Sequence, residues 1–121
     1  MAKQLRKGDE TQRRWAIIDA SRSRDAGMLP QLLARLAGGE SPDNERHIVR
    51  ALGNIGGPQA EARLVELLAS RRDLILGEIA QALGKLGSRA AKPGLEALLD
   101  HESEWVRQNA RFALRRLGTR G

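Results

Sequence analysis

The sequence predicts an all-α fold, an α-solenoid built from stacked helical hairpins, and three observations lead to it. Residue types that favour helices, such as Ala, Leu, Arg, Glu and Gln, dominate the chain of 121 residues. Aromatic residues, which favour strands, are limited to two Trp and one Phe. The motif Ala-Leu-x-x-(Ile/Leu)-Gly occurs at residues 51–56, 82–87 and 113–118, each copy 31 residues after the one before. A constant period of this length is typical of solenoid repeats.

A second pattern recurs between these motifs and predicts a shorter helix in each repeat. Helix starts that contain leucine lie at residues 29–32, 61–64 and 92–95, and each is followed by another leucine four residues later. These starts are 32 and then 31 residues apart, so one connection is a residue longer. Residues 38–42, with two glycines and a proline, are its expected place. Proline in the first turn and glycine after the last turn are favourable helix ends.

Each repeat unit is therefore predicted to be a short helix, a tight connection and a longer helix that ends at glycine. About seven helices are expected, one leading helix and then three helix pairs, near residues 11–24, 28–37, 44–55, 59–70, 73–86, 90–99 and 104–117. Residues 1–10 are expected to form a flexible basic segment. Residues 11–121 are predicted to be a single domain with repeat units at roughly 28–56, 59–87 and 90–118.

The last repeat resembles a known family. Residues 98–118 read LLDHESEWVRQNARFALRRLG, which is similar to the HEAT-like repeat of phycobilin lyase subunits. The resemblance extends over residues 28–118 and more loosely over residues 9–27. It implies a HEAT-like α-solenoid in which the second, longer helix of each pair lines a concave surface, usually the binding face in that family. It indicates a fold more specifically than an activity, because such repeats are widely used as scaffolds.

Composition and charge exclude several classes of protein. Cysteine is absent, which excludes disulfides, thiolate metal sites and cysteine nucleophiles. No apolar run approaches the roughly 20 residues that span a bilayer, and none follows the basic N-terminal residues as in a secretory signal. The protein is therefore expected in the cytoplasm and not in a membrane. Basic residues exceed acidic ones by seven to three in residues 1–24 and by five to one in residues 104–121, whereas the middle is nearly neutral.

The last predicted helix separates into three faces when its residues are placed at intervals of about 100°. One face is apolar and is the expected core: Val106, Ala110, Ala113, Leu114 and Leu117, matched one repeat earlier by Ile75, Ile79, Ala82, Leu83 and Leu86. A second face should meet the next repeat, and earlier repeats carry small or apolar residues there. The last repeat carries Arg107, Arg111 and Arg115 instead, which are interpreted as an end cap or, alternatively, as an anion contact.

The third face should line the concave groove and supplies the candidate partner-binding residues. With the leading helix included, they are Trp105, Phe112, Arg116, Asn109, Gln81, Lys85, Arg46, Arg50 and Trp15. Trp, Phe and Arg carry much of the binding energy at protein interfaces, because they bury large areas or donate several hydrogen bonds. Under this hypothesis all three aromatic residues lie on or beside one surface. The alternative is that Trp105 and Phe112 fold back as core or edge residues.

Residues that would support catalysis are sparse. The two histidines, His47 and His101, fall in different repeats and have no partnering carboxylate at the spacing of metal ligands. The glycine pairs at residues 38–39 and 56–57 are expected helix ends and not phosphate-binding loops. No enzymatic activity, metal ion or cofactor is therefore expected.

Three functional hypotheses follow. The first is a protein-interaction scaffold whose concave face binds an acidic or amphipathic segment of a protein partner through aromatic anchors and orienting cations. The second is a nucleic-acid-binding solenoid in which the same cations contact phosphates and Trp105 or Trp15 stacks on an exposed base. Asp43, Asp73 and Glu78 would interrupt its basic track. The third, implied by the family resemblance alone, is an accessory subunit related to phycobilin lyases.

Overall fold

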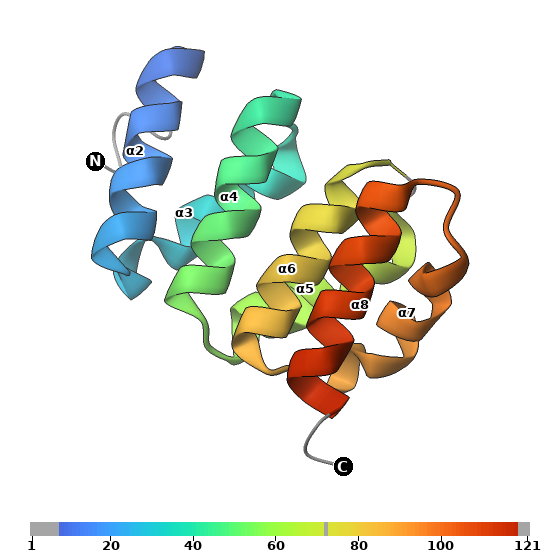
Figure 1. Ribbon diagram of the computed structural model, residues 1–121. Coiled ribbons are helices and arrows are strands. Elements are labelled where there is room, and N and C mark those ends of the chain that lie inside the picture. The colour runs from blue at the N-terminus through green and yellow to red at the C-terminus, as the bar shows by residue number, and fades with distance from the viewer. Residues whose placement is uncertain (1–7, 72, 119–121) are drawn as a thin grey trace.

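Helices account for nearly all of the structure, a computed structural model that describes residues 8–71 and 73–118 (Figure 1). Within these ranges the α-helices are α2 (Glu10–Ser23), α3 (Leu29–Gly38), α4 (Pro42–Ile55), α5 (Pro58–Ser70), α6 (Ile75–Leu86), α7 (Lys92–Ala97) and α8 (Glu104–Gly118). The same ranges hold 3-10 turns at Ala26–Met28, Arg89–Ala91 and Leu98–Asp100. The order confirms the predicted all-α solenoid of a leading helix and three helix pairs. Within the described part of the chain, no helix has the length and apolar character needed to cross a membrane.

The helices form two layers (Figure 1). Helices α2, α4, α6 and α8 lie side by side in chain order in the first layer, and α3, α5 and α7 lie behind them in the second. Each hairpin therefore contributes its second helix to the first layer. We call the exposed side of the first layer the inner face; it includes Arg46, Arg50, Gln81, Lys85 and Phe112.

Helix ends follow the predicted signals. Prolines 30, 42, 58 and 93 lie in the first turns of α3, α4, α5 and α7, where their missing N–H leaves no helical hydrogen bond unmade. Gly87 ends α6 in the left-handed conformation, with φ of 69°. Helix α7 is shorter than the helix predicted over residues 90–99, because 3-10 turns flank it on both sides.

The start of α2 is fixed by its N-cap. The carboxylate of Asp9 accepts a hydrogen bond from the backbone N–H of Gln12, whose side chain accepts one from the backbone N–H of Asp9. This reciprocal capping box satisfies two donors that the helix itself leaves unpaired. Helix α2 therefore begins at Glu10. Of the segment predicted to be flexible, residues 1–7 lie outside the described residues.

Small residues let the first-layer helices approach closely at two equivalent junctions. A Cβ built on Gly53 of α4 would lie 3.0 Å from the Cβ of Ala82 on α6. One repeat later, a Cβ built on Gly84 of α6 would lie 2.8 Å from the Cβ of Ala113 on α8. Ala82 is 5% exposed and Ala113 is fully buried. The predicted stacking through small residues is confirmed, and so is the predicted core face except that Leu86 and Leu114 are only partly buried.

The longer connection predicted at residues 38–42 carries a buried ion cluster. Glu40, between α3 and α4, turns its carboxylate inward, and this side chain is fully buried. Its oxygens accept hydrogen bonds from Arg13 of α2 (2.8 and 2.9 Å), from Arg35 of α3 (3.0 Å) and from the backbone N–H of Ser41 (3.0 Å). Burial alone would raise the pKa of Glu40, but these hydrogen bonds outweigh it and lower the pKa to about 2. The loop thereby joins α2 to the first hairpin.

This cluster makes part of the folding stability depend on acid pH. Because the pKa of Glu40 is lower in the folded state than its ordinary value of 4.5, its contribution is present above pH 4.5 and is lost as the pH falls towards 2. The shift corresponds to about 3 kcal/mol. We expect Glu40→Gln to have a smaller free energy of unfolding than the wild type at neutral pH. Between pH 4.5 and 2, its free energy of unfolding should fall by about 3 kcal/mol less than that of the wild type. Urea unfolding followed by circular dichroism measures both losses, and equal losses would contradict the lowered pKa.

Candidate functional site

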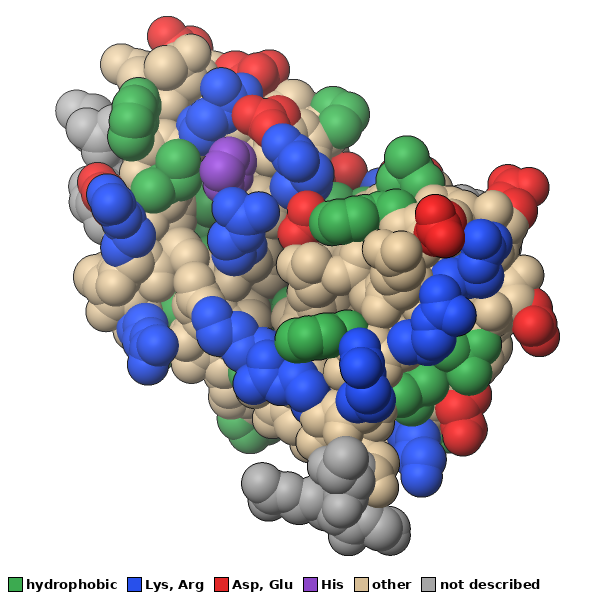
Figure 2. All heavy atoms as spheres, viewed as in Figure 1, with side chains coloured by type: hydrophobic (Ala, Val, Ile, Leu, Met, Phe, Trp, Pro, Cys, Tyr) green, Lys and Arg blue, Asp and Glu red, His purple; other side chains and the backbone are tan. Residues whose placement is uncertain are grey.

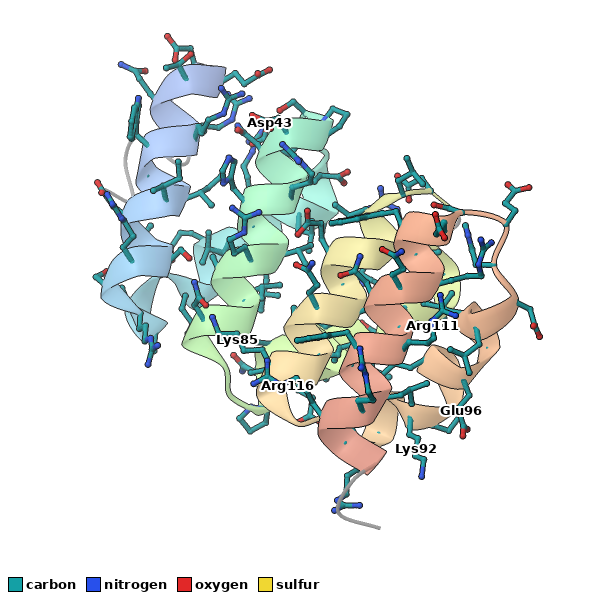
Figure 3. All side chains as sticks on the ribbon, in the orientation of Figure 1. Asp43, Lys85, Lys92, Glu96, Arg111 and Arg116 are labelled. Carbon is teal, nitrogen blue, oxygen red and sulfur yellow. The ribbon has the colours of Figure 1, made fainter. Side chains whose placement is uncertain are left out.

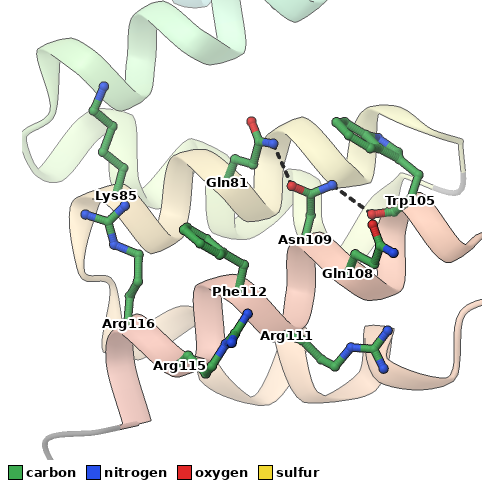
Figure 4. A pocket seen from close by; sticks show the side chains of 9 residues that line it. All are labelled: Gln81, Lys85, Trp105, Gln108, Asn109, Arg111, Phe112, Arg115 and Arg116. Carbon is green, nitrogen blue, oxygen red and sulfur yellow. Dashed lines mark hydrogen bonds between the residues drawn. The ribbon is translucent and has the colours of Figure 1, made fainter.

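A depression of about 720 Å³ lies between α6 and α8 on the inner face (Figure 4). The residues that line it are Gln81, Lys85, Trp105, Gln108, Asn109, Arg111, Phe112, Arg115 and Arg116. We call this the cationic depression. It combines three kinds of side chain: cations, side-chain amides and two exposed aromatic rings.

The cationic depression is lined by four positively charged residues and by no acidic one. Among the described residues, no acidic side chain forms an ion pair with Lys85, Arg111, Arg115 or Arg116. Lys85 donates to the side-chain oxygen of Asn54 on α4 instead. In the space-filling view, basic side chains gather around the C-terminal halves of α6 and α8 (Figure 2). Like charges held together without a counter-ion favour an anionic ligand.

Phe112 organises the cations at one end of this depression. Its ring is 51% exposed, and the guanidinium carbons of Arg115 and Arg116 lie 5.8 and 6.0 Å from the ring centroid. Both distances are within reach of a cation–π attraction. Lys85 extends instead from α6 towards α4, where its amine donates to Asn54 (Figure 3; close view in Figure 4). Two guanidinium groups of α8 therefore share one aromatic ring, and Lys85 adds a third cation beside them.

Side-chain amides form the middle of the depression. Gln81 donates from Nε2 to Oδ1 of Asn109 at 2.6 Å, and Asn109 donates from Nδ2 to the carbonyl oxygen of Trp105 at 2.7 Å (Figure 4). Asn109 is only 7% exposed, so its amide is committed to these two bonds. Asn109 thus orients Gln81 from below, whereas Gln81 and Gln108 are exposed.

Trp105 marks the boundary between two depressions. Its indole lies over Gly77 of α6 so closely that a Cβ at Gly77 would overlap the ring. The side chain is nevertheless 44% exposed. On its other side lies a second depression of about 540 Å³. This second depression, which we call the Leu74 depression, is lined by Trp105 together with Pro42, Glu45, Arg46, Asp73, Leu74, Ile75 and Glu78.

The Leu74 depression presents apolar surface beside acidic residues that have partners. Leu74 is 61% exposed, the highest exposed fraction among the exposed large apolar residues described. Two of the acidic residues, Glu45 and Asp73, are paired with Arg71 at 3.1 and 2.7 Å. The third lies 3.8 Å from Arg50. The two depressions therefore differ in chemistry, although they share the indole of Trp105.

The structure brings together most of the residues predicted from the sequence. Six predicted partner-binding residues line the cationic depression: Trp105, Phe112, Arg116, Asn109, Gln81 and Lys85. Arg46 lies at the Leu74 depression and is paired with Asp43, while Arg50 faces Glu78. The exposure of Trp105 and Phe112 argues against the alternative that they fold into the core.

Trp15 is not gathered with the other two aromatic residues. It lies on α2, which is separated from α8 by α4 and α6, and it lines neither depression. Among the residues of α2 that bond to α4 are Arg14, which donates to Asn44 at 2.9 Å, and Ser21, which accepts from Asn54 at 2.7 Å. Trp15 is 60% exposed beside them.

The predicted end-cap arginines have two different environments. Arg107 donates to the carbonyl oxygens of His101 and Glu102 at 2.6 and 3.0 Å and so holds the loop before α8. Arg111 and Arg115 line the cationic depression and also a shallower depression on the outer side of α8. The sequence predicted an end cap or an anion contact for them, but did not place them beside the partner-binding residues. Phe112 directly follows Arg111 in the chain and is exposed. This neighbour could have indicated that Arg111 lies beside the partner-binding residues as well as at the end of the stack.

Comparison with known proteins identifies the repeat. A family described as HEAT repeats matches residues 29–115, well over half of the chain. No curated protein matches the sequence significantly. Within the described part of the chain, no group of three or more His, Cys, Asp or Glu side chains could hold a metal ion. The matched residues include α3 to α7 and most of α8, and therefore both depressions.

Proposed function

The chain belongs to the HEAT repeat family, and we propose that it is a non-enzymatic module that binds an acidic segment of a partner protein on its inner face. HEAT repeats generally serve as protein-interaction scaffolds. The compartment that we propose for this interaction is the cytoplasm, in keeping with the absence of cysteine.

The observation that supports this proposal is the cationic depression. Four cations without an acidic neighbour in the lining would stabilise several carboxylates at once, because each arginine donates hydrogen bonds in a fixed fork. Trp105 and Phe112 are half exposed beside them and would bury apolar area when a partner covers them. Cations thus orient the ligand and raise its rate of association, while the aromatic rings supply the burial.

Single-stranded nucleic acid is the second candidate ligand. An exposed phenylalanine flanked by two guanidinium groups is an arrangement on which a base can stack while the arginines contact phosphate. Against it, the cations on α4 are engaged with acids, Arg46 with Asp43 and Arg50 with Glu78. A nucleic-acid track would need those cations along its length. The protein ligand is therefore the first proposal.

Charge reversal at the depression tests the proposed function. We expect Lys85→Glu combined with Arg116→Glu to weaken binding of a fluorescent glutamate-rich peptide about 100-fold, since each lost charge-assisted bond contributes about 1.5 kcal/mol. The matched control is Arg89→Glu with Lys92→Glu, which makes the same charge change on exposed residues outside both depressions. Fluorescence anisotropy at physiological salt measures both affinities.

The control and the salt dependence decide between the outcomes. Equal losses in the two double variants would mean that net charge alone attracts the peptide, which contradicts a site on the inner face. If a single-stranded oligonucleotide binds more tightly than the peptide, and its affinity falls steeply with salt, the site binds nucleic acid and the proposed protein ligand is wrong. The proposal expects the peptide to bind more tightly and to retain more of its affinity in salt, because apolar burial is not screened.

A further inference from the structure

We propose that the bound segment is extended and ordered, with one large apolar side chain in the Leu74 depression and acidic residues about three to five positions away at the cationic depression. This inference rests on the proposed function and specifies its ligand. It is drawn from the two depressions that meet at Trp105 and differ in charge.

An apolar side chain fits the Leu74 depression better than a charged one. Leu74, Ile75 and the edge of Trp105 offer apolar surface that water now covers. The acids around it already have partners, because Arg71 bridges Glu45 and Asp73. A further charge placed there would gain little and would lose hydration. Burial of a leucine-sized side chain would instead contribute about 1.5–3 kcal/mol before ordering costs.

The opposite end of the site selects carboxylates. Arg115 and Arg116 lie over the ring of Phe112, Lys85 lines the same depression, and no acidic side chain lines it. Lys85, near the end of α6, and the two arginines, near the end of α8, sit in the last turns of their helices. Among the described residues, the hydrogen-bond partner of Lys85 is the amide of Asn54, and the cation–π partner of the two arginines is the Phe112 ring. An acidic group arriving here meets cations that have no competing carboxylate.

The middle of the site suits an extended backbone. Gln81 and Gln108 lie between the two aromatic rings, and both are exposed. A side-chain amide carries a donor and an acceptor, so it can pair with a backbone N–H and a backbone C=O of the ligand. An extended segment has both groups free, whereas a helix uses them within itself. The amides therefore favour an extended ligand over a helical one.

The spacing follows from the geometry of α8. Trp105 and Phe112 are seven residues apart, and Trp105 and Arg116 are eleven apart. At a rise of about 1.5 Å per residue these separations are roughly 10 and 16 Å along the helix axis. An extended chain advances about 3.3 Å per residue and so covers them in about three to five residues. This range sets the distance between the apolar residue and the acidic residues.

Peptides that differ in residue order, in one residue or in conformation test the inference. In a Trp15→Phe protein, Trp105 is the only tryptophan, so its fluorescence reports on the site directly. The probe is a peptide of serine and glycine with one leucine about four residues from a short run of glutamates, made in both chain directions. It is compared with a peptide in which leucine adjoins the glutamates, one in which serine replaces leucine, and a stapled helical version.

We expect the spaced peptide, in one chain direction, to bind about tenfold more tightly than each comparison peptide, a difference of about 1.4 kcal/mol. Leu74→Ser should remove this preference, whereas the matched control Leu99→Ser, at the depression on the outer side of α8, should keep it. Equal affinities for all acidic peptides would overturn the order, and equal binding of the stapled peptide would overturn the extended form. Both results leave the proposed function standing. If none of the acidic peptides binds the otherwise intact protein, the proposed function fails and the inference fails with it.

Discussion

Replacement of Ala82 by arginine is expected to remove the cooperative unfolding transition or to lower its midpoint by about 15 °C or more. Ala82 is 5% exposed on α6, and its Cβ lies 3.0 Å from the position that a Cβ on Gly53 of α4 would occupy. A guanidinium group at this junction must either separate the two helices or remain buried without a partner, and each choice costs several kcal/mol. Domains of this size are stabilised by only about 5–15 kcal/mol in total.

The matched control for this variant is Ala34→Arg. Ala34 lies within α3 and is exposed, so the same substitution adds the same charge without entering a junction. Its melting midpoint should stay within a few degrees of the wild type, because exposed substitutions usually change stability by less than about 0.5 kcal/mol. Thermal unfolding followed by circular dichroism compares the three proteins. Unchanged melting of Ala82→Arg would contradict the packing register of α4 and α6.

The register of the repeats could be predicted because the same local signals occur three times. The pair Gly53 and Ala82 recurs one period later as Gly84 and Ala113, so a single alignment fixes both junctions. The leading helix has no such copy in the Ala-Leu motif. Its orientation is set by contacts with α4, such as the bond from Arg14 to Asn44, which join residues 30 positions apart in the chain. Trp15 was grouped with Trp105 and Phe112, whereas it lines neither depression.

The direction of a helical side chain could be predicted, but its partners across helices could not. The 3.6-residue period was sufficient to place Phe112 and Arg116 on the inner face. It could not show that Arg71 would pair with Glu45, 26 residues earlier in the chain, beside the Leu74 depression. Ion pairs of this kind arise from tertiary distances that no local pattern encodes.

The aromatic anchors should carry more of the affinity than any other pair of residues. We expect Trp105→Ala combined with Phe112→Ala to weaken binding of the glutamate-rich peptide that carries a spaced leucine by about 1,000-fold, since anchor residues of this kind contribute about 2 kcal/mol or more each. Both side chains are about half exposed in the free protein, at 44% and 51%. Their removal should therefore change helix content little. Anisotropy titrations measure the affinities, and circular dichroism checks the fold.

Additivity of the two single variants shows whether the anchors act in separate places. Trp105 and Phe112 are seven residues apart on α8, or roughly 10 Å, a separation at which mutational effects usually add within about 0.5 kcal/mol. Phe112→Ala should also raise the salt dependence of binding, because Arg115 and Arg116 lose the ring beside which they are held. Trp15→Ala is the matched control and should bind as the wild type does, since α2 contributes no residue to either depression. A loss with Trp15→Ala as large as that with Trp105→Ala would place the ligand along the whole inner face rather than between α6 and α8.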